Sequence, residues 1–249
     1  MAQQTPIYIV ASPRPRVGKT LLARLLVEFF RSSSRPLAAY DLNPRDPVLA
    51  GYFPKLVTPI DIADTRGQMM LFDRLVGRSA ATRVIDVGYG AYDQFFSVMA
   101  EIGFVREARR RMIEPVVLFA ADHAAVTVRA YADLLRDLPD LTMVPAHNEF
   151  ISVTCDKDDF PPTRAACRMI RIPRLSQMVR GVIDRPTFSF GAYMVATPGT
   201  PTEIHDWIAG IFAEFRELEL RLLMGTLAAS LARGGAAAQQ DRKRGSSGG

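Results

Sequence analysis

The chain has 249 residues, of which 48% are hydrophobic and 23% charged, and its formal net charge is +5. This length suits one large domain with a buried core, and the composition excludes a disordered or collagen-like chain. Two cysteines and three histidines exclude a disulfide framework and a structural zinc site, and no stretch reads as a signal peptide or membrane span, so we expect a cytoplasmic protein.

Short, predominantly apolar runs predict strands that are buried on both faces of a parallel sheet. They are residues 7–10, 37–40, 84–87, 116–120 and 141–144. Between them, apolar residues recur at helical spacing in 21–29, 69–76, 95–102 and 126–138. This alternation predicts an α/β fold, a doubly wound and mostly parallel sheet with helices on both faces. Ligands of such sheets bind beyond the carboxyl ends of the strands.

The C-terminal third is less regular. Residues 147–162 read as a surface loop to which we assign no chemistry, and helical spacing returns over 202–221. The apolar residues continue to Leu231, and we expect this last helix to pack on the sheet with its final turns projecting. Residues 234–249 have no apolar periodicity and are expected to be disordered. We therefore predict one domain over 1–233 and a disordered tail over 234–249.

A phosphate-binding motif lies between the first predicted strand and the first predicted helix. In the P-loop template, the lysine corresponding to Lys19 reaches the β- and γ-phosphates, and the hydroxyl corresponding to Thr20 ligates Mg²⁺. The predicted phosphate contacts are Arg16, Val17, Gly18, Lys19, Thr20 and Leu21. Pro13 replaces the first glycine of the template and Pro15 lies inside the loop, so two backbone N–H donors are missing.

Two aspartates follow predicted strands at the same edge of the sheet. Asp86 closes the segment Val84-Ile-Asp86, and Asp41 directly follows the run at 37–40. A Mg²⁺ ion that bridges phosphates needs carboxylate neutralisation, so we predict a metal site from Thr20, Asp41 and Asp86. The less favoured reading of Asp86 is a turn or helix-capping residue, because Gly88 and Gly90 follow closely.

The motif around the phosphate loop resembles that of the ParA/MinD family of P-loop ATPases. That family has Lys-Gly-Gly-x-Gly-Lys-[Thr/Ser] after its first strand, and this chain has Arg14-Pro-Arg-Val-Gly-Lys-Thr20. The resemblance implies ATP and Mg²⁺ as cofactors and an ATP-dependent homodimer with the nucleotides between the subunits. Arg14 takes the position of the early lysine, which reaches across to the phosphates of the partner, and arginine supplies the charge with bidentate geometry.

A second part of the resemblance concerns hydrolysis. The family has Asp-x-Asp-Pro after its second strand, and this chain has Asp41-Leu-Asn-Pro44, so Asn43 replaces the aspartate that helps to position the attacking water. An amide can bind water but cannot accept its proton. The resemblance therefore assigns catalysis to Lys19, Arg14, Asn43 and Asp41 and implies slow or impaired hydrolysis.

The resemblance also places the adenine base. Ile172-Pro173 is similar to the segment that begins a short helix beside the base, which makes Pro173 a contact candidate. Asn148 follows the run at 141–144, where the family often has an asparagine near the base, although a simple loop residue is an equal reading. Asp122 and His123 read as a helix cap and an exposed first-turn residue rather than as catalytic groups.

Three functions remain open at this stage. The leading one is an ATP-dependent switch that dimerises and recruits or positions a protein partner. The second is a degenerate scaffold of the same fold, favoured by Pro13, Pro15 and Asn43, and the last is an ATP-dependent ligase similar to dethiobiotin synthetases. Arginines within 106–111 and 164–180 suit nucleic acid, an anionic membrane or an acidic protein, but a solvated, ion-paired surface is the favoured reading. The predicted last helix has few basic residues, so we favour packing over membrane targeting.

Overall fold

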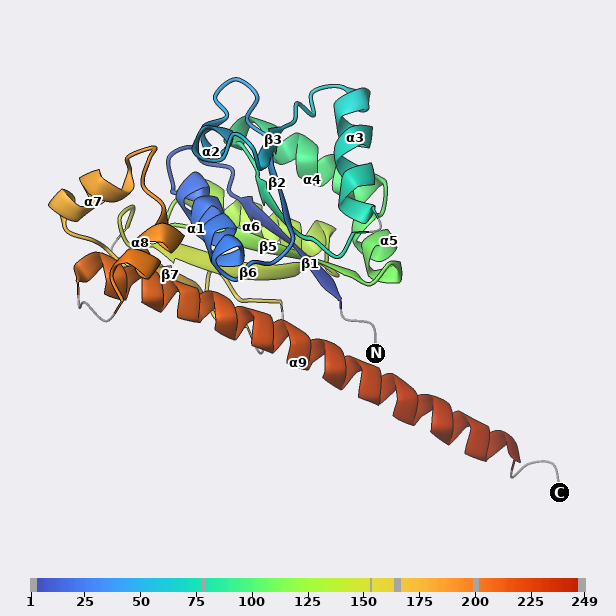
Figure 1. Ribbon diagram of the computed structural model, residues 1–249. Helices are drawn as coiled ribbons and strands as arrows, with labels where there is room; N and C mark the ends of the chain where they lie inside the picture. The colour runs from blue at the N-terminus through green and yellow to red at the C-terminus, as the bar shows by residue number, and fades with distance from the viewer. Residues whose placement is uncertain (1–3, 78, 153, 164–166, 199–201, 246–249) are drawn as a thin grey trace.

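The computed structural model describes residues 4–77, 79–152, 154–163, 167–198 and 202–245. Within these residues a seven-stranded sheet has the order β3-β2-β4-β1-β5-β6-β7, and every neighbouring pair is parallel. Its strands are β1 (Thr5–Ala11), β2 (Leu37–Asp41), β3 (Val57–Pro59), β4 (Thr82–Asp86), β5 (Ile113–Ala121), β6 (Thr142–Asn148) and β7 (Ile170–Ile172). Helices cover both faces (Figure 1), so the predicted α/β fold is confirmed.

The helices alternate with the strands along the chain. They are α1 (Lys19–Ser32), α2 (Val48–Tyr52), α3 (Thr65–Val76), α4 (Tyr92–Glu101), α5 (Phe104–Arg110), α6 (Ala125–Asp137), α7 (Gln177–Ile183), α8 (Phe190–Ala196) and α9 (Glu203–Gly245), with a 3-10 turn at Tyr89–Ala91. Each predicted strand and helix coincides with one of these elements, and apart from the C-terminal end of α9 the ends are shifted by a few residues. The sequence analysis missed β3 and β7, which have three residues each and lie at the two edges of the sheet.

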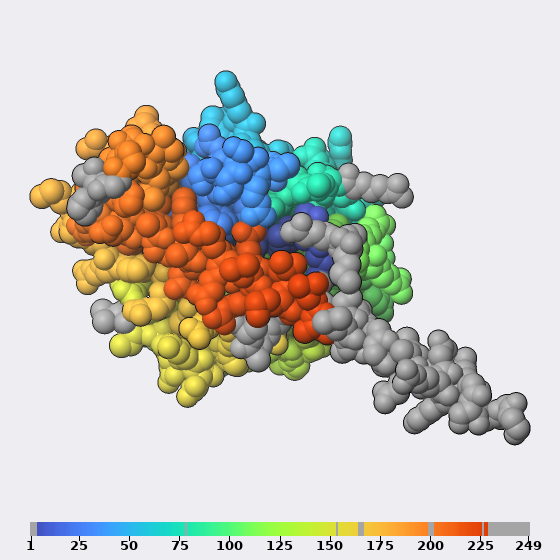
Figure 2. Space-filling view, turned by 60° about the horizontal axis from the view of Figure 1, so that its bottom comes forward, coloured from blue at the N-terminus to red at the C-terminus, as the bar shows by residue number. Residues whose placement is uncertain are grey.

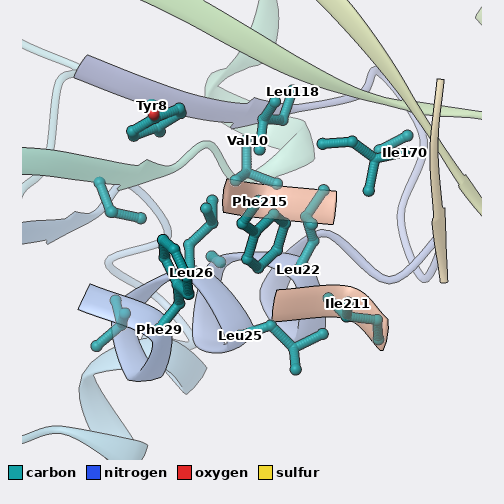
Figure 3. Close-up of a cluster of buried hydrophobic side chains, with 14 of the residues drawn as sticks. Tyr8, Val10, Leu22, Leu25, Leu26, Phe29, Leu118, Ile170, Ile211 and Phe215 are labelled. Atoms are coloured by element: carbon teal, nitrogen blue, oxygen red, sulfur yellow. The ribbon is translucent and has the colours of Figure 1, made fainter. Parts of the chain in front are cut away.

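Strand alternation divides the apolar residues of the sheet between two cores. Tyr8 and Val10 of β1 belong to the core that is formed with α1 and α9, whereas Ile7 and Ile9 belong to the opposite core with α3 to α6. Figure 3 shows the first core, where Leu22, Leu26 and Phe29 of α1 lie among Val10, Leu118, Ile211 and Phe215. Both faces of the central strands are therefore buried, which holds their carboxyl ends in fixed positions.

Helix α9 lies along α1 (Figure 2). The ring of Phe29 packs edge-on against Phe212 and Phe215 at centroid distances of 5.4 and 5.6 Å, and Arg35 forms an ion pair with Glu219 at 2.7 Å. No helix of the described residues is long and apolar enough to cross a membrane. Helix α1, which follows the loop after β1, is thus packed directly against the C-terminal helix.

The end of α9 differs from the sequence prediction. The structure continues this helix to Gly245, so residues 234–245 form its last turns where disorder is expected. Alanine, glutamine and arginine, which recur in this segment, have high helix propensity. Residues 246–249 of the predicted tail and Arg164 of the arginine-rich segment lie outside the described residues. The division into one domain and a tail stays a prediction.

Candidate nucleotide-binding site

A tight loop over residues 12–18 connects β1 to α1 at the carboxyl edge of the sheet. Gly18 precedes the helix with a φ of 91°, and a Cβ there would lie 2.1 Å from the Asn148 amide nitrogen, so only glycine fits. Arg16 is exposed and has a φ of 58°, a conformation that is uncommon outside glycine. The loop ends at the N-terminus of α1, which is a favourable place for an anion.

Lys19 is the first residue of α1, and its side chain turns back over the loop. It is 8% exposed, and its ammonium group donates a hydrogen bond to the Arg14 carbonyl. Burial lowers the pKa of Lys19 to about 8, although the nearby charge of Asp86 acts in the opposite direction. A desolvated ammonium group in a loop of this shape favours an anionic ligand.

Thr20 on α1 and Asp86 at the end of β4 are brought together because α1 follows β1, the strand beside β4 in the sheet. In the parallel pairing of β1 with β4, Asp86 lies opposite Val10, and the Thr20 hydroxyl donates a hydrogen bond of 2.7 Å to Asp86 Oδ2. Burial raises the pKa of Asp86 to about 7, and Asp41 raises it further, while Thr20 and Lys19 lower it. Asp86 Oδ1 is buried and has no hydrogen-bond partner among the described residues.

This unpaired carboxylate oxygen fits a divalent cation. A bound cation would hold Asp86 ionised and would supply the partner that Oδ1 lacks. The described residues contain no group of three or more His, Cys, Asp or Glu side chains that could hold a metal by themselves. Mg²⁺ commonly binds through one or two protein oxygens together with substrate phosphates, so Thr20 and Asp86 are sufficient for such a site.

Asp41 lies near this pair but is engaged elsewhere. It pairs in register with Asp86 on the adjacent strand, and one of its oxygens accepts hydrogen bonds from Leu49 N at 2.9 Å and Ala50 N at 3.2 Å. Its other oxygen accepts from Asn43 N at 3.1 Å. The carboxylate therefore holds the loop after β2 against the start of α2, and the predicted role of Asp41 in catalysis and metal binding stays a prediction.

Asn43 lies in the same loop. Its side-chain amide donates a hydrogen bond of 2.7 Å to the carbonyl of Asp46, which shapes the turn before α2. A Cβ on Gly88 of the loop after β4 would lie 3.1 Å from Asn43 Cβ, so the two loops are in close contact. The structure thus places Asn43 beside the strand that carries Asp86.

The two predicted base contacts lie at the ends of neighbouring strands, since Asn148 is opposite Ile172 in the pairing of β6 with β7. The Asn148 amide is turned toward the phosphate loop, where it donates to the Val17 carbonyl at 3.4 Å, and its oxygen accepts from a backbone N–H at 3.1 Å. The carbonyl of Pro173 accepts a hydrogen bond of 2.7 Å from the indole N–H of Trp207. Asn148 therefore supports the loop, and a base contact by either residue stays a prediction.

The predicted site did not include the partner of Arg14. The Arg14 guanidinium forms an ion pair of 2.5 Å with Asp122, which directly follows β5, so it is directed toward the sheet edge of its own chain. Asp122 also accepts a hydrogen bond of 2.9 Å from Ala124 N. Helix α6 begins at Ala125 with Ala124 as its N-cap and without a side-chain capping bond, so the expected capping role of Asp122 is wrong and this bond shapes the turn before the helix. His123 is exposed as expected, but it precedes the first turn. The sequence signal was the position of Asp122 directly after a buried strand, at the same edge as Lys19.

Comparison with known proteins gives a likeness in structure only. No family model matches the chain, and no curated protein sequence matches it. Among solved structures, the MinC:MinD cell division protein complex of Aquifex aeolicus is similar, with a TM-score of 0.47 and 13% sequence identity. The match covers 85% of this chain and 96% of that chain.

Proposed function

We propose that this protein binds ATP with Mg²⁺ in the loop between β1 and α1 and acts as a nucleotide-dependent switch. The observation that carries the proposal is the hydrogen bond between Thr20 and Asp86, beside a buried carboxylate oxygen that has no partner among the described residues. A Mg²⁺–phosphate complex requires a hydroxyl at the start of the helix that follows the loop, here α1, and a carboxylate at the end of a strand beside β1 in the sheet, here β4.

Each residue then has a role that follows from its position. Thr20 and Asp86 would hold Mg²⁺, which supplies charge neutralisation between the phosphates when bound. Lys19 exchanges the Arg14 carbonyl for phosphate oxygens, because a charged acceptor makes a stronger hydrogen bond than a neutral one. The N–H groups of residues 16–21 face the phosphates at the positive end of the α1 dipole.

The switch consists of dimer formation. Two subunits close over their nucleotides, Arg14 reaches the phosphates held by the partner, and the closed dimer recruits or positions a protein partner. Hydrolysis is slow because Asn43 can orient a water molecule but cannot take its proton. This part of the proposal is supported by the motif of residues 14–20 and by the exposed part of Arg14, whose side chain is 38% exposed.

A scaffold without nucleotide turnover is the second candidate. It is favoured by Pro13 and Pro15, which remove two N–H donors from the loop, and by the hydrogen bond that already occupies the Lys19 ammonium group. Each missing donor weakens phosphate binding by about 1 kcal/mol or more. The two candidates differ in their affinity for nucleotide and in turnover.

Calorimetric titration of the full chain with ATP, in the presence and absence of Mg²⁺, tests the proposal. Wild-type protein should bind one nucleotide per subunit, and Lys19→Ala should bind about 100-fold more weakly, because a charge-assisted hydrogen bond is worth up to about 3 kcal/mol. Lys55→Ala removes an exposed lysine and serves as the matched control. Absence of binding by the wild-type protein at millimolar ATP would refute the nucleotide site and leave the scaffold.

A further inference from the structure

Arg14 and Asp122 are held together by the central strands of the sheet. Arg14 lies in the loop after β1 and Asp122 directly follows β5, and these strands pair in parallel with Ala11 opposite Phe119. The two side chains form an ion pair of 2.5 Å although they are 108 residues apart in the sequence. Their contact is therefore a property of the folded sheet edge and not of a local turn.

The two side chains of this ion pair differ in how exposed they are and in how firmly they are held. The Asp122 side chain is 1% exposed, and its second oxygen is fixed by the hydrogen bond from Ala124 N at 2.9 Å. The Arg14 side chain is 38% exposed. Among the described residues, no other side chain of the loop after β1 forms an ion pair with Asp122. A compensating charge stabilises a buried carboxylate, and Arg14 is the partly exposed partner, so Asp122 is the fixed member of the pair and Arg14 the one that can move.

The backbone of Arg14 is also engaged within the loop. The Arg14 carbonyl accepts the hydrogen bond from the Lys19 ammonium group, so Arg14 and Lys19 are both paired within one subunit. The contact with Asp122 is made through Nη1 and holds the guanidinium against the sheet edge of its own subunit. Movement of the guanidinium toward a second subunit lengthens this contact, so the ion pair opposes such a movement.

We propose that Asp122 is a positioning residue that holds Arg14 inside its own subunit and sets the affinity of the nucleotide-dependent dimer. On dimer formation the guanidinium leaves the Asp122 carboxylate and pairs with phosphate oxygens of the nucleotide in the partner subunit. Two such ion pairs open in each dimer, and the free energy needed to open them makes the free energy of association less favourable. The inference rests on the proposed function and adds to it the residue that opposes dimerisation.

Sedimentation equilibrium with Mg²⁺ and ATPγS tests this inference through the dimer dissociation constant. Asp122→Asn keeps an oxygen for Ala124 N but removes the charge, and we expect its dimer to form about tenfold more tightly than wild type, which is 1.4 kcal/mol. In an Arg14→Gln background the same substitution should change the constant by less than about twofold. This dependence on Arg14 separates release of the arginine from a general loosening of the loop.

Two further variants complete the experiment. Asp122→Ser also accepts a hydrogen bond from Ala124 N and replaces Asp122→Asn if the latter does not fold, as judged by circular dichroism. Asp140→Asn removes the same charge from an exposed position before β6, at the opposite edge of the sheet, and should leave the constant unchanged.

The outcomes distinguish the inference from the proposed function. Equal or weaker dimerisation of folded Asp122→Asn and Asp122→Ser, with a wild-type dimer present, would overturn the role of Asp122 and leave the switch intact. Monomers in every variant, although calorimetry shows ATP binding, would overturn both the dimer and the role of Asp122. A dimer in the Asp122 variants under conditions where the wild type is monomeric would support the inference.

Discussion

Replacing Asp86 by asparagine should stabilise the nucleotide-free protein at pH 8. The ordinary pKa of this carboxyl is 3.8, and burial raises it to about 7. Ionising Asp86 in the folded protein therefore costs about 4 kcal/mol, at 1.36 kcal/mol for each pKa unit. Asparagine can still accept the hydrogen bond from the Thr20 hydroxyl, but it carries no charge that would need Mg²⁺ for neutralisation.

The sign of the effect follows from the two protonation states. The folded protein holds the Asp86 proton up to about pH 7, whereas the unfolded chain loses it near pH 3.8. The stability that this group contributes is therefore fully present below pH 3.8 and is lost as the pH rises through 7. The advantage of Asp86→Asn should grow from about 2 kcal/mol at pH 5 to about 4 kcal/mol at pH 8.

Urea unfolding followed by circular dichroism at pH 5 and pH 8, without nucleotide, measures this difference. Asp64→Asn is the matched control, because Asp64 caps α3 through a hydrogen bond from Gly67 N and asparagine caps a helix equally well. Its free energy of unfolding should stay within about 0.5 kcal/mol of wild type at both pH values. An advantage of Asp86→Asn that does not grow with pH, or a loss of stability at pH 8, would refute the reasoning.

Three further predictions concern the loop, the turnover and the C-terminal helix. Gly18→Ala should lower the free energy of unfolding, measured in urea, by about 3 kcal/mol, because residue 18 has a positive φ and a Cβ there clashes with Asn148. Adding Asn148→Ala to the same chain should remove only the part of this loss that is due to the clash. A Gly18→Ala protein as stable as wild type would contradict the loop geometry. Asn43→Asp should raise ATP turnover at least about tenfold in a phosphate-release assay, whereas an unchanged rate would favour the scaffold. Trp207, the only tryptophan of the sequence, donates a hydrogen bond to the carbonyl of Pro173, the predicted base contact. Binding of ATP with Mg²⁺ beside Pro173 should therefore shift the fluorescence emission of Trp207. An emission that saturating ATP leaves unchanged would argue against a base site beside Pro173.

The long strands could be predicted from the sequence because their signal is local. β1 and β5 are buried on both faces, so nearly every residue in them is apolar, and the run itself marks the strand. The edge strands β3 and β7 have three residues each and are held by their neighbours, as Ile172 is by Asn148. Such short segments have no periodicity of their own, so their pairing could not be read from the sequence.

The candidate site divides in the same way. Gly18, Lys19 and Thr20 are consecutive, and their template fixes their geometry, while Asp86 is placed by the rule that parallel strands end at one edge. The sequence did not give the partner of Arg14, which is the side chain of Asp122 at the end of a different strand. Which of several nearby partners a long side chain takes depends on distances of about an ångström, and these are set by packing of the whole sheet.

The central claim is that ATP with Mg²⁺ converts the protein from a monomer into a dimer. Light scattering on a sizing column measures the mass directly, with Mg²⁺ and with ATP, ADP or no nucleotide in turn. We expect a mass near twice the 27.6 kDa of the chain with ATP and not with ADP or without nucleotide, and a monomer for Lys19→Ala in every condition. A single mass for the wild-type protein, unchanged by ATP at concentrations where calorimetry shows binding, would contradict it.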